Sequence, residues 1–475
     1  MTTGIAAGTA PITGSISGPG FTMASGLARV SAMRGIVLAD AESRALPVAG
    51  QHDLPAHADV VVIGGGIIGI ATAYYLAQKR MSVVVLEKGS VGAEQSSRSF
   101  GAVISRRSSP ADMAFTLHSR ALWHGLSARI GRDVSFRADG MTIFCSGDEE
   151  VAAHEEWIGQ ARVSGLDDAR IITGDELQRR SHGASSAPKA ALLIEGDGGV
   201  NPAAVTSVLA QAAMDSGARI LTNCAARAVE TSGGAISEVI TERGSIRTKN
   251  VVLAGGSWTR LFAGNAGIDL PFLGVFLSEQ RIGAVDGPPG VGSMGAVGWR
   301  REAGGTYASG AETMVAPVTL DSFQLFRAFL PMLRSMESGI KLGLGGEFIR
   351  SMRVPRRWKP DDRSPFESAR TVAPAPNHRH LDESLAALRA AFPVFQKSQV
   401  IERWGGTLTV TPDNEPVISA VPGIDGMFVN SGFSLGITMG PGAGHLMADL
   451  VSGQEPAVDP GPFSLERFHP AKAPA

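Results

Sequence analysis

The chain has 475 residues and a formal net charge of −2, and this near-neutral balance argues against a nucleic-acid-binding protein, which carries a basic excess or patch. Its two cysteines, Cys145 and Cys224, lie far apart and indicate neither a disulfide framework nor a metal site, so we expect a reducing, cytoplasmic location. No uninterrupted apolar run reaches the roughly 18 residues of a membrane-spanning helix, so no transmembrane segment is expected.

Residues 1–57 differ in composition from the rest of the chain. Residues 1–26 are rich in Gly, Ala, Ser and Thr, carry no charge, and lack the basic segment of a secretory signal peptide. We therefore expect a disordered N-terminal extension over 1–57, or a stretch upstream of a true start at Met23 or Met33. A transit or leader function is the alternative.

The first predicted structural unit is DVVVIGGGIIGIATAYYLAQKRMSVVVLEK, residues 59–88. Residues 60–63 are short, apolar and β-branched, which is typical of a buried parallel strand. Residues 70–79 have helical periodicity, and residues 81–86 read as a second strand closed by Glu87. The order of strand, glycines, helix, strand and acid predicts a dinucleotide-binding βαβ unit.

Three glycines of this unit fit the pattern G-x-G-x-x-G. Gly64 is expected to make the tight turn, Gly66 to let a pyrophosphate reach the backbone at the helix N-terminus, and Gly69 to let the helix pack on the strand. Glu87 stands where a carboxylate accepts the ribose hydroxyls of an adenosine.

The segment after Glu87 favours FAD over NAD. Residues 89–103, GSVGAEQSSRSFGAV, are rich in Ser and Gly, whereas a simple nicotinamide enzyme would continue with another βα unit. Residues 247–262 and 426–453 each repeat the order of apolar strand, glycine turn and helix. We call each such strand–turn–helix segment a crossing. The three crossings are far apart in the sequence and are expected to converge on one extended ligand.

Two long segments, 105–195 and 271–400, interrupt these units. In the first, Ser109 and Pro110 predict the start of a helix that runs to about residue 130. The second contains strand-like pieces, a predicted helix over 319–336, and a helix over 380–393 that a proline ends. This alternation predicts an antiparallel sheet with helices.

Together these segments resemble the FAD-dependent glycine oxidase/D-amino acid oxidase superfamily, which includes sarcosine oxidases, D-amino acid dehydrogenases and some bacterial L-amino acid oxidases. The resemblance covers roughly residues 58–454. It implies an α/β fold in which a Rossmann-like FAD-binding domain of the glutathione-reductase type is interleaved with an α+β substrate-binding domain built on an antiparallel sheet. The FAD-binding domain would comprise 58–104, 196–270 and 401–456, and the substrate-binding domain 105–195 and 271–400.

The resemblance also implies FAD as a non-covalent cofactor, since neither cysteine lies in the C-terminal segment where covalent members attach the flavin. The backbone at Ala226 would contact the adenine, Ser97 and Arg98 would face the phosphates, and Gly101 would lie beside the flavin. The residues expected to contact FAD are Gly64, Gly66, Ile67, Ile68, Gly69, Glu87, Lys88, Ser96, Ser97, Arg98, Ser99, Gly101, Ala102, Ala226, Ala254, Gly255, Trp258, Gly432, Phe433, Ser434, Leu435, Gly436, Ile437 and Thr438.

Oxidation of an amine by flavin requires orientation of the substrate C–H toward flavin N5 and no catalytic base, so we expect no catalytic side chain and no metal. A substrate carboxylate would need an arginine, and Arg106 and Arg281 are candidates, with Arg107, Arg300 and Arg403 as alternatives. Glu402 and Trp404 are candidates for an ammonium contact and an apolar wall. A surface arginine, a rim glutamate and a core tryptophan are the competing structural interpretations.

Two departures from the superfamily pattern concern substrate recognition. Many relatives carry an arginine shortly after the glycine that corresponds to Gly101, whereas here arginines follow only at Arg106 and Arg107. Relatives often have Gly-His-Gly after the Gly-Phe-Ser of residues 432–434, whereas here Leu435 and Gly436 follow. FAD binding is expected despite these differences, whereas the substrate is expected to differ from that of these relatives or to bind its carboxylate from another strand.

The predicted function is an FAD-dependent oxidase or dehydrogenase that oxidises an amino acid or related amine at the C–N bond, giving an imine and then an oxo acid or aldehyde. The electron acceptor would be oxygen or a quinone, and a homo-oligomer is compatible with the sequence. A flavin-dependent 2-hydroxy acid dehydrogenase, or an electron-transferring subunit of a dehydrogenase complex, is the alternative.

Overall fold

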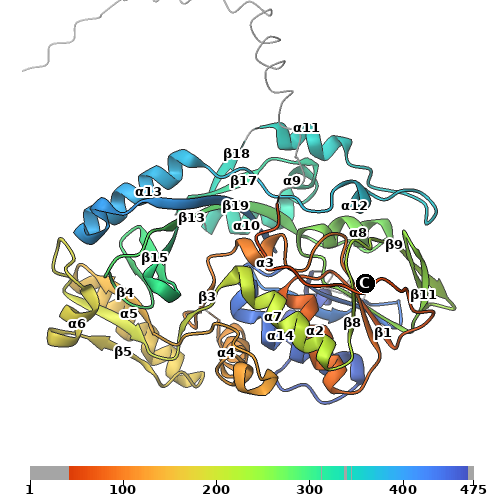
Figure 1. The fold of residues 1–475 in the computed structure, drawn as a ribbon, viewed down its shortest axis with the longest axis horizontal. Coiled ribbons are helices and arrows are strands. Elements are labelled where there is room, and N and C mark those ends of the chain that lie inside the picture. The colour runs from red at the N-terminus through yellow and green to blue at the C-terminus, as the bar shows by residue number, and fades with distance from the viewer. Residues whose placement is uncertain (1–41, 108, 312, 336–339, 344, 469–475) are drawn as a thin grey trace, which may run out of the picture. The chain divides into compact units, whose positions relative to one another are not determined.

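The computed structural model of the chain describes residues 42–107, 109–311, 313–335, 340–343 and 345–468, which belong to one compact unit, 38–475. No helix in this described part is long and apolar enough to cross a membrane. The features that position the site are two sheets and the helices that cover them (Figure 1).

The first sheet has six strands in the order β20-β21-β12-β1-β2-β8. Its strands are parallel except β20, which pairs antiparallel with β21 at one edge. The runs VVVI, VVVL and NVVL of its central strands are apolar and β-branched, as a sheet covered on both faces requires. The strands are β1 (Val60–Ile63), β2 (Val83–Leu86), β8 (Arg219–Leu221), β12 (Asn250–Leu253), β20 (Val417–Ala420) and β21 (Met427–Ser431).

Helices cover one face of this sheet, and a small sheet covers the other. The helices are α2 (Ile67–Gln78), α7 (Pro202–Asp215) and α14 (Gly436–Ser452), which form one hydrophobic core with Val60 and Val62 (Figure 1). The second core contains Val61 and Val84 and the three-stranded sheet of β9 (Ala226–Ser232), β10 (Ala235–Thr241) and β11 (Gly244–Arg247). Alternate side chains of each strand therefore enter different cores.

The second sheet has ten strands, in the order β18-β17-β13-β16-β15-β14-β4-β6-β5, with β19 paired to β13. Most neighbouring pairs are antiparallel, as expected, whereas β14–β4 and β17–β18 are parallel. The strands are β4 (Met141–Cys145), β5 (Ala169–Ile172), β6 (Ala190–Ile194), β13 (Leu273–Ile282), β14 (Val291–Met294), β15 (Val297–Arg301), β16 (Tyr307–Gly310), β17 (Met314–Pro317), β18 (Ile340–Gly343) and β19 (Val400–Val410).

Strand β19 differs from the domain division expected from the sequence, which placed residues 401–456 with the FAD-binding segments. It pairs with β13 from Leu273 to Ile282 and so belongs to the ten-stranded sheet. The C-terminal end of β19 leads into β20 of the six-stranded sheet, so β19 connects the two sheets.

The helix starting at Ser109 is confirmed as α4 (Pro110–Ile130), because the Ser109 side chain accepts a hydrogen bond from Asp112 N and proline is the first helical residue. The expected helix over 319–336 is two helices, which meet at Leu325. The remaining helices and short strands are α3 (Gln95–Arg98), β3 (Ala102–Val103), α5 (Asp148–Val163), α6 (Gly174–Ser181), β7 (Gly198–Gly199), α8 (Thr259–Asn265), α9 (Leu320–Gln324), α10 (Phe326–Ser335), α11 (Gly346–Arg353), α12 (Pro365–Ser368) and α13 (His378–Ala391), with 3-10 turns at Gly256–Trp258, Ala303–Gly305, Pro393–Lys397, Gly461–Phe463 and Leu465–Phe468.

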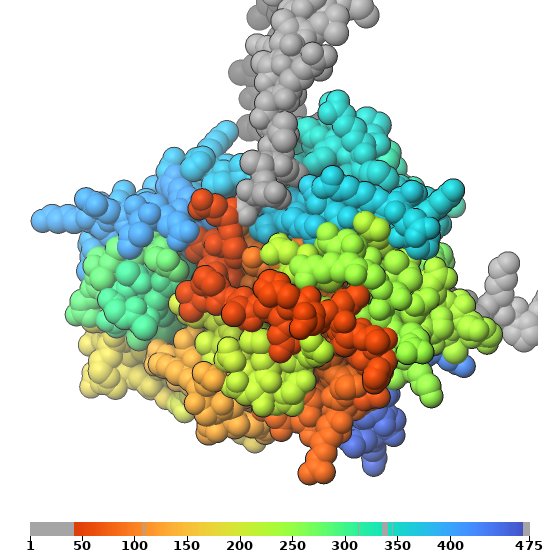
Figure 2. All heavy atoms as spheres, turned by 45° about the vertical axis from the view of Figure 1, so that its right-hand side comes forward, coloured from red at the N-terminus to blue at the C-terminus, as the bar shows by residue number. Residues whose placement is uncertain are grey.

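Residues 42–57 are ordered against the body of the protein, which corrects the expectation of disorder for this part of the extension. Leu46 N donates to Ala203 O at 2.8 Å, Gln51 N donates to Ile220 O at 2.8 Å, and Ala56 O accepts from Arg247 N at 3.1 Å. The segment runs across the surface in red in Figure 2. Backbone hydrogen bonds hold the segment in place, and amino-acid composition gives no information about such bonds. Residues 1–41 lie outside the described residues.

Candidate functional site

A cavity of about 400 Å³, a volume typical of small-molecule sites, begins at the turn between β1 and α2. Gly64 has a φ of +117°, and a Cβ there would lie 2.4 Å from Ala254 O, so the turn requires glycine. A Cβ on Gly69 would lie 2.0 Å from Gly64 O, so α2 approaches the turn more closely than any side chain permits. The two glycines keep the backbone at the cavity wall.

The N-terminus of α2 faces this cavity. Gly66 precedes the helix and provides no side-chain cap, and a Cβ on it would meet only Ser96 Oγ, at 3.2 Å. Ser96 Oγ accepts a hydrogen bond from Ile67 N at 2.9 Å, and Gly66, Ile67, Ile68 and Ser96 all line the cavity. The N–H groups and dipole at the start of a helix attract an anion, so a pyrophosphate fits here.

Glu87 directly follows β2 and also lines the cavity. Its Oε2 accepts from Gly65 N and its Oε1 from Gly89 N, both at 2.7 Å. Burial raises the pKa of Glu87, although Lys88 and the two amides favour the carboxylate. The amides fix the carboxylate at the wall, where its remaining lone pairs can accept ribose hydroxyls.

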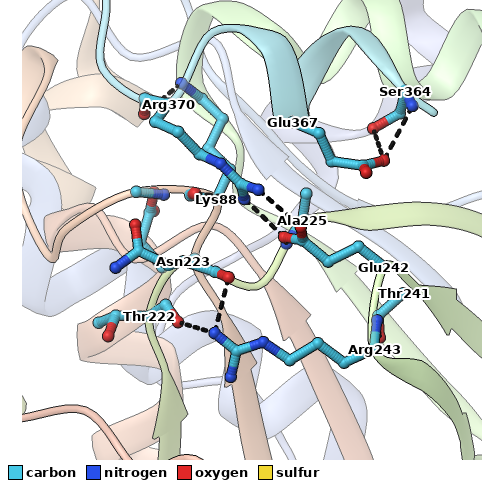
Figure 3. Close-up of polar contacts among 12 residues, drawn as sticks. Lys88, Thr222, Asn223, Ala225, Thr241, Glu242, Arg243, Ser364, Glu367 and Arg370 are labelled. Carbon is cyan, nitrogen blue, oxygen red and sulfur yellow. Dashed lines mark hydrogen bonds and ion pairs between the residues drawn. The ribbon is translucent and has the colours of Figure 1, made fainter. Parts of the chain in front are cut away.

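The expected adenine contact, Ala226, lies at the start of β9 beside a partly buried polar network, which Figure 3 shows. Ala225 N donates to Glu242 Oε1 at 2.7 Å, and Glu242 forms a bidentate pair with Arg370 at 2.5 and 2.6 Å. Arg370 Nη1 also donates to Lys88 O at 2.8 Å. The network joins the end of β2 to the start of β9, and it was not predicted because its members are distant in the sequence.

The second crossing follows β12, where Ala254, Gly255 and Trp258 line the cavity. Trp258 Nε1 donates to Glu94 Oε2 at 2.8 Å, and Lys88 Nζ lies 4.6 Å from the centroid of the Trp258 ring. Both contacts hold the indole in place beside the glycines.

The third crossing follows β21, where residues 432–435 pass into α14 along the cavity. Thr438 Oγ1 donates to Ala102 O at 3.0 Å and so joins α14 to the Ser/Gly-rich segment. Gly101, on that segment, has a φ of +80°. The three crossings thus meet at one cavity, and the donors and the backbone surfaces present fit an FAD molecule.

Of the 24 residues expected to contact FAD, all except Gly69, Ser97 and Arg98 are among the lining residues. Gly69 lies against the Gly64 carbonyl, and Ser97 is buried in α3. Arg98 donates to Glu42 O at 2.7 Å and to Gly405 O at 3.4 Å. It therefore joins the N-terminal segment to β19, and we do not place it at the phosphates.

Beyond the flavin segments, the ten-stranded sheet and its loops complete the cavity. The residues there that sequence reasoning missed are Leu277, Glu279, Ala311, Met314, Leu408 and Thr409. This end is apolar apart from Glu279 and Thr409. Lys88, next to Glu87, is the one basic residue among the described lining residues.

Glu279 is an acid in an apolar wall. It lies on β13 opposite Gly310 of β16 and Trp404 of β19, and it is 6% exposed. Its Oε2 has no hydrogen-bond partner among the described residues. Burial raises the pKa of Glu279 to about 8, and Arg300 and Arg44 hold the pKa below the value that burial alone would give.

The expected substrate residues Arg281, Glu402 and Trp404 belong to an ion-pair network beside this wall. Arg281 lies 3.3 Å from Glu402 and also pairs with Glu302 at 2.8 Å. Arg44 pairs with Glu402, and its guanidinium carbon lies 3.6 Å from the centroid of the Trp404 ring. The charged groups of Arg281 and Glu402 are therefore already paired within the protein, and the Trp404 ring already contacts a guanidinium.

Arg106, the fourth expected substrate residue, lies with its guanidinium carbon 5.7 Å from the centroid of the Trp157 ring. None of the four expected substrate residues is among the described lining residues. Of the alternatives, Arg107 pairs with Asp112 and Arg403 with Asp382, whereas Arg300 is buried and pairs with Glu302 at 2.7 Å.

The comparisons with known proteins agree with this geometry. A family model described as FAD dependent oxidoreductase matches residues 59–450. The structure is similar to that of L-amino acid deaminase from Proteus myxofaciens in complex with anthranilate, with a TM-score of 0.88 and 42% identity over 90% of this chain and 98% of that one. The L-amino acid deaminase from Proteus vulgaris gives a TM-score of 0.86 and 38% identity, over 89% of this chain and 100% of that one.

A more distant relative is the sarcosine oxidase subunit beta of Rhodobacter capsulatus, which is 26% identical over 86% of this chain and 88% of its own length. The glycine oxidase of Bacillus subtilis is 25% identical over 84% of this chain and 94% of its own length.

Proposed function

This chain belongs to the family of FAD dependent oxidoreductases, and we propose that it oxidises an amino acid or a related amine at the C–N bond. The observation that carries the proposal is one continuous cavity, which runs from the N-terminus of α2 to an apolar end formed by the ten-stranded sheet. The likeness to an L-amino acid deaminase over 90% of the chain supports it. The alternative predicted from the sequence, oxidation of a 2-hydroxy acid, finds no such support among these relatives.

We place FAD in the cavity by the residues that line it. The N-terminus of α2 at Gly66 and Ile67 would hold the pyrophosphate, Glu87 the adenosine ribose, and the backbone at Ala226 the adenine. Residues 432–438 would follow the isoalloxazine ring, on the side where Gly101 allows a close approach.

When bound, FAD supplies a hydride acceptor, and the protein supplies orientation and a dry surface. Leu277, Met314 and Leu408 form an apolar wall that would exclude water and hold the carbon skeleton of the substrate. A substrate amine loses hydride from the carbon that bears its nitrogen, and the imine formed then adds water to give an oxo acid or aldehyde and ammonia or a smaller amine.

Matched pairs of compounds test the proposal against its alternative. Phenylalanine and 3-phenyllactate differ in one group, the amine or the hydroxyl on the same carbon. We expect anaerobic reduction of the bound flavin by amino compounds and not by their hydroxy counterparts, with release of one ammonia per flavin reduced by a primary amine. Reduction by the hydroxy acids alone would contradict the proposal. Reoxidation by air or by a quinone then identifies the electron acceptor.

A further inference from the structure

The cavity wall formed by the ten-stranded sheet contains one carboxylate, that of Glu279, whose charge is balanced only at a distance, by Arg300 and Arg44. Leu277 and Glu279 are two residues apart on β13, so they share a face, and both line the cavity. Glu279 Oε2 makes no hydrogen bond to the described residues. A buried carboxylate without a partner is costly, so its position facing a ligand cavity needs a reason beyond the fold.

The surrounding sequence makes room for this carboxylate. Gly310 faces Glu279 across β16, and a Cβ on Gly310 would lie 2.8 Å from Glu279 Oε2 and 2.9 Å from Oε1. A side chain at Gly310 would therefore displace the acid. The carboxylate thus occupies a space that a missing side chain provides.

The neighbouring charges show that the acid is not part of the internal ion-pair network. Arg300 and Arg281 both pair with Glu302, and Arg44 and Arg281 both pair with Glu402. Two glutamates therefore neutralise two of these three arginines. A charged Glu279 would balance the positive charge of the third arginine. That positive charge stabilises the ionised form of Glu279 without a direct contact between the two side chains.

We propose that Glu279 receives the amino group of the substrate, and that the substrate is a primary or secondary amine whose carbon skeleton is apolar. The inference rests on the proposed function, whose substrate class it narrows. The ammonium of the substrate donates to the Glu279 carboxylate, and the apolar side chains around it hold the skeleton.

Glu279 would also remove the proton that hinders the reaction. An ammonium has no lone pair to assist hydride loss, so the substrate must be neutral when it reacts. One proton passes from the substrate nitrogen to the Glu279 carboxylate, which gives a neutral amine and a neutral carboxylic acid. Because the pKa of Glu279 is about 8, closer to that of an alkylamine than the pKa of an ordinary carboxyl group is, this transfer is less unfavourable than transfer to an exposed carboxylate.

The charged groups that face Glu279 are Arg300 on β15 and Arg44 on the N-terminal segment. The residues opposite it on β16 and β19, Gly310 and Trp404, do not titrate. The ionised fraction of Glu279 therefore sets how affinity for an ammonium changes with pH. For a pKa of about 8 this fraction rises about 50-fold between pH 6 and pH 8.

The test is calorimetric binding of 2-phenylpropan-2-amine to the FAD-loaded protein. The carbon that bears its amino group has no hydrogen, so binding is measured without oxidation, and 2-phenylpropan-2-ol is the uncharged control. We expect the affinity for the amine to rise about 50-fold from pH 6 to pH 8 and the affinity for the alcohol to stay constant. An amine that does not bind, or binds with no dependence on pH, would overturn the proposal.

Three variants sharpen this test. Glu279→Gln should weaken amine binding at pH 8 at least tenfold and remove its pH dependence, without weakening binding of the alcohol. Gly310→Ala keeps the acid but displaces it, so it should also weaken amine binding. Glu402→Gln, the matched control, removes a carboxylate outside the lining residues and should retain the pH dependence. Equal loss of pH dependence in Glu402→Gln and Glu279→Gln would contradict a direct contact.

The outcomes separate this inference from the proposed function. If amine binding follows the expected pH dependence but no amine or amino acid reduces the flavin, the amine site stands and the proposed oxidation fails. If amines reduce the flavin while Glu279→Gln keeps the wild-type KM and pH profile, the oxidation stands and the role of Glu279 fails.

Discussion

Gly66 and Gly69, three residues apart, are needed for different reasons. A Cβ on Gly66 would meet one flexible hydroxyl, at 3.2 Å, and would point toward the cavity that Gly66 lines. A Cβ on Gly69 would lie 2.0 Å from a backbone carbonyl oxygen. The first glycine therefore keeps space for the ligand, and the second keeps the helix against the turn.

We predict that Gly66→Val gives a folded protein that binds FAD at least tenfold more weakly, because the side chain occupies pyrophosphate space. Gly69→Val should instead lower the stability of the fold itself, since backbone must move. Fluorescence titration of the apoprotein with FAD and thermal unfolding measure the two effects. Gly125→Ala, at an open site on α4, is the control. Unchanged FAD affinity in Gly66→Val would contradict the placement of the pyrophosphate.

Arg44 links the N-terminal segment to the chemistry of Glu279. Its guanidinium stacks on Trp404 and pairs with Glu402, and burial lowers its own pKa to about 10. It is also one of two arginines that hold down the pKa of Glu279. We predict that Arg44→Ala raises the pKa of Glu279, so that the midpoint of amine binding moves to higher pH.

Calorimetry across a pH series measures this shift. Arg44→Lys keeps a positive charge without the planar stacking surface, so it should give a smaller shift. A midpoint that moves to lower pH in Arg44→Ala would contradict the electrostatic explanation.

At the scale of elements, the segment 42–57 behaves as part of the fold. Three backbone hydrogen bonds and the Arg44–Trp404 contact hold it against α7, β8 and β11 and against β19. We expect Arg44→Ala to cost about 1–2 kcal/mol of unfolding free energy, because it removes a stacked cation that is mostly buried. Denaturant unfolding measures this change in unfolding free energy. A change within experimental error would show that the segment is held by its backbone alone.

Helix α12 is stabilised by a capping box that is sensitive to acid. Glu367 Oε1 accepts from Ser364 N at 2.8 Å, and Arg227 Nε donates to the same carboxylate at 2.9 Å (Figure 3 shows the Ser364 contact). Burial raises the pKa of Glu367, but the contacts with Arg227 and Ser364 outweigh burial and lower the pKa to about 2. The folded protein thus binds the proton less readily than the unfolded chain.

The sign of the pH effect follows from this lowered pKa. The stability that Glu367 contributes is present above the unfolded pKa of about 4.5 and is lost as the pH falls through about 2. We predict that Glu367→Gln costs about 1 kcal/mol at neutral pH and that its difference from wild type shrinks between pH 5 and pH 3. Thermal unfolding at several pH values measures this difference. A difference that grows on acidification would contradict the prediction.

For the whole molecule, local patterns predicted the parts of the site that are local. The βαβ unit at 59–88 and the later glycine turns each carry their signal within about 30 residues, and these turns meet at one cavity. The contacts of Arg98 with residues 42 and 405 could not be predicted from a local pattern, because these residues are distant in the chain. Composition alone also misjudged residues 42–57, whose order depends on hydrogen bonds to α7, β8 and β11.

The substrate end of the cavity could not be predicted from single motifs. Glu279 faces the cavity because β13 pairs with both β16 and β19, which brings Gly310 and Trp404 to its two sides. In the sequence it is one acid in the run LGVFLSEQRI, between an apolar stretch and an arginine. Arg281 and Glu402, chosen for their charge, neutralise each other instead.

The central claim is that this protein binds FAD and reduces it with an amino compound. Its most direct test is anaerobic titration of the purified protein, reconstituted with FAD, with amines and with D- and L-amino acids. We expect a yellow protein whose visible flavin absorbance is bleached by one equivalent of a substrate amine. A protein that stays colourless after reconstitution, or one whose flavin no amino compound bleaches, would contradict it.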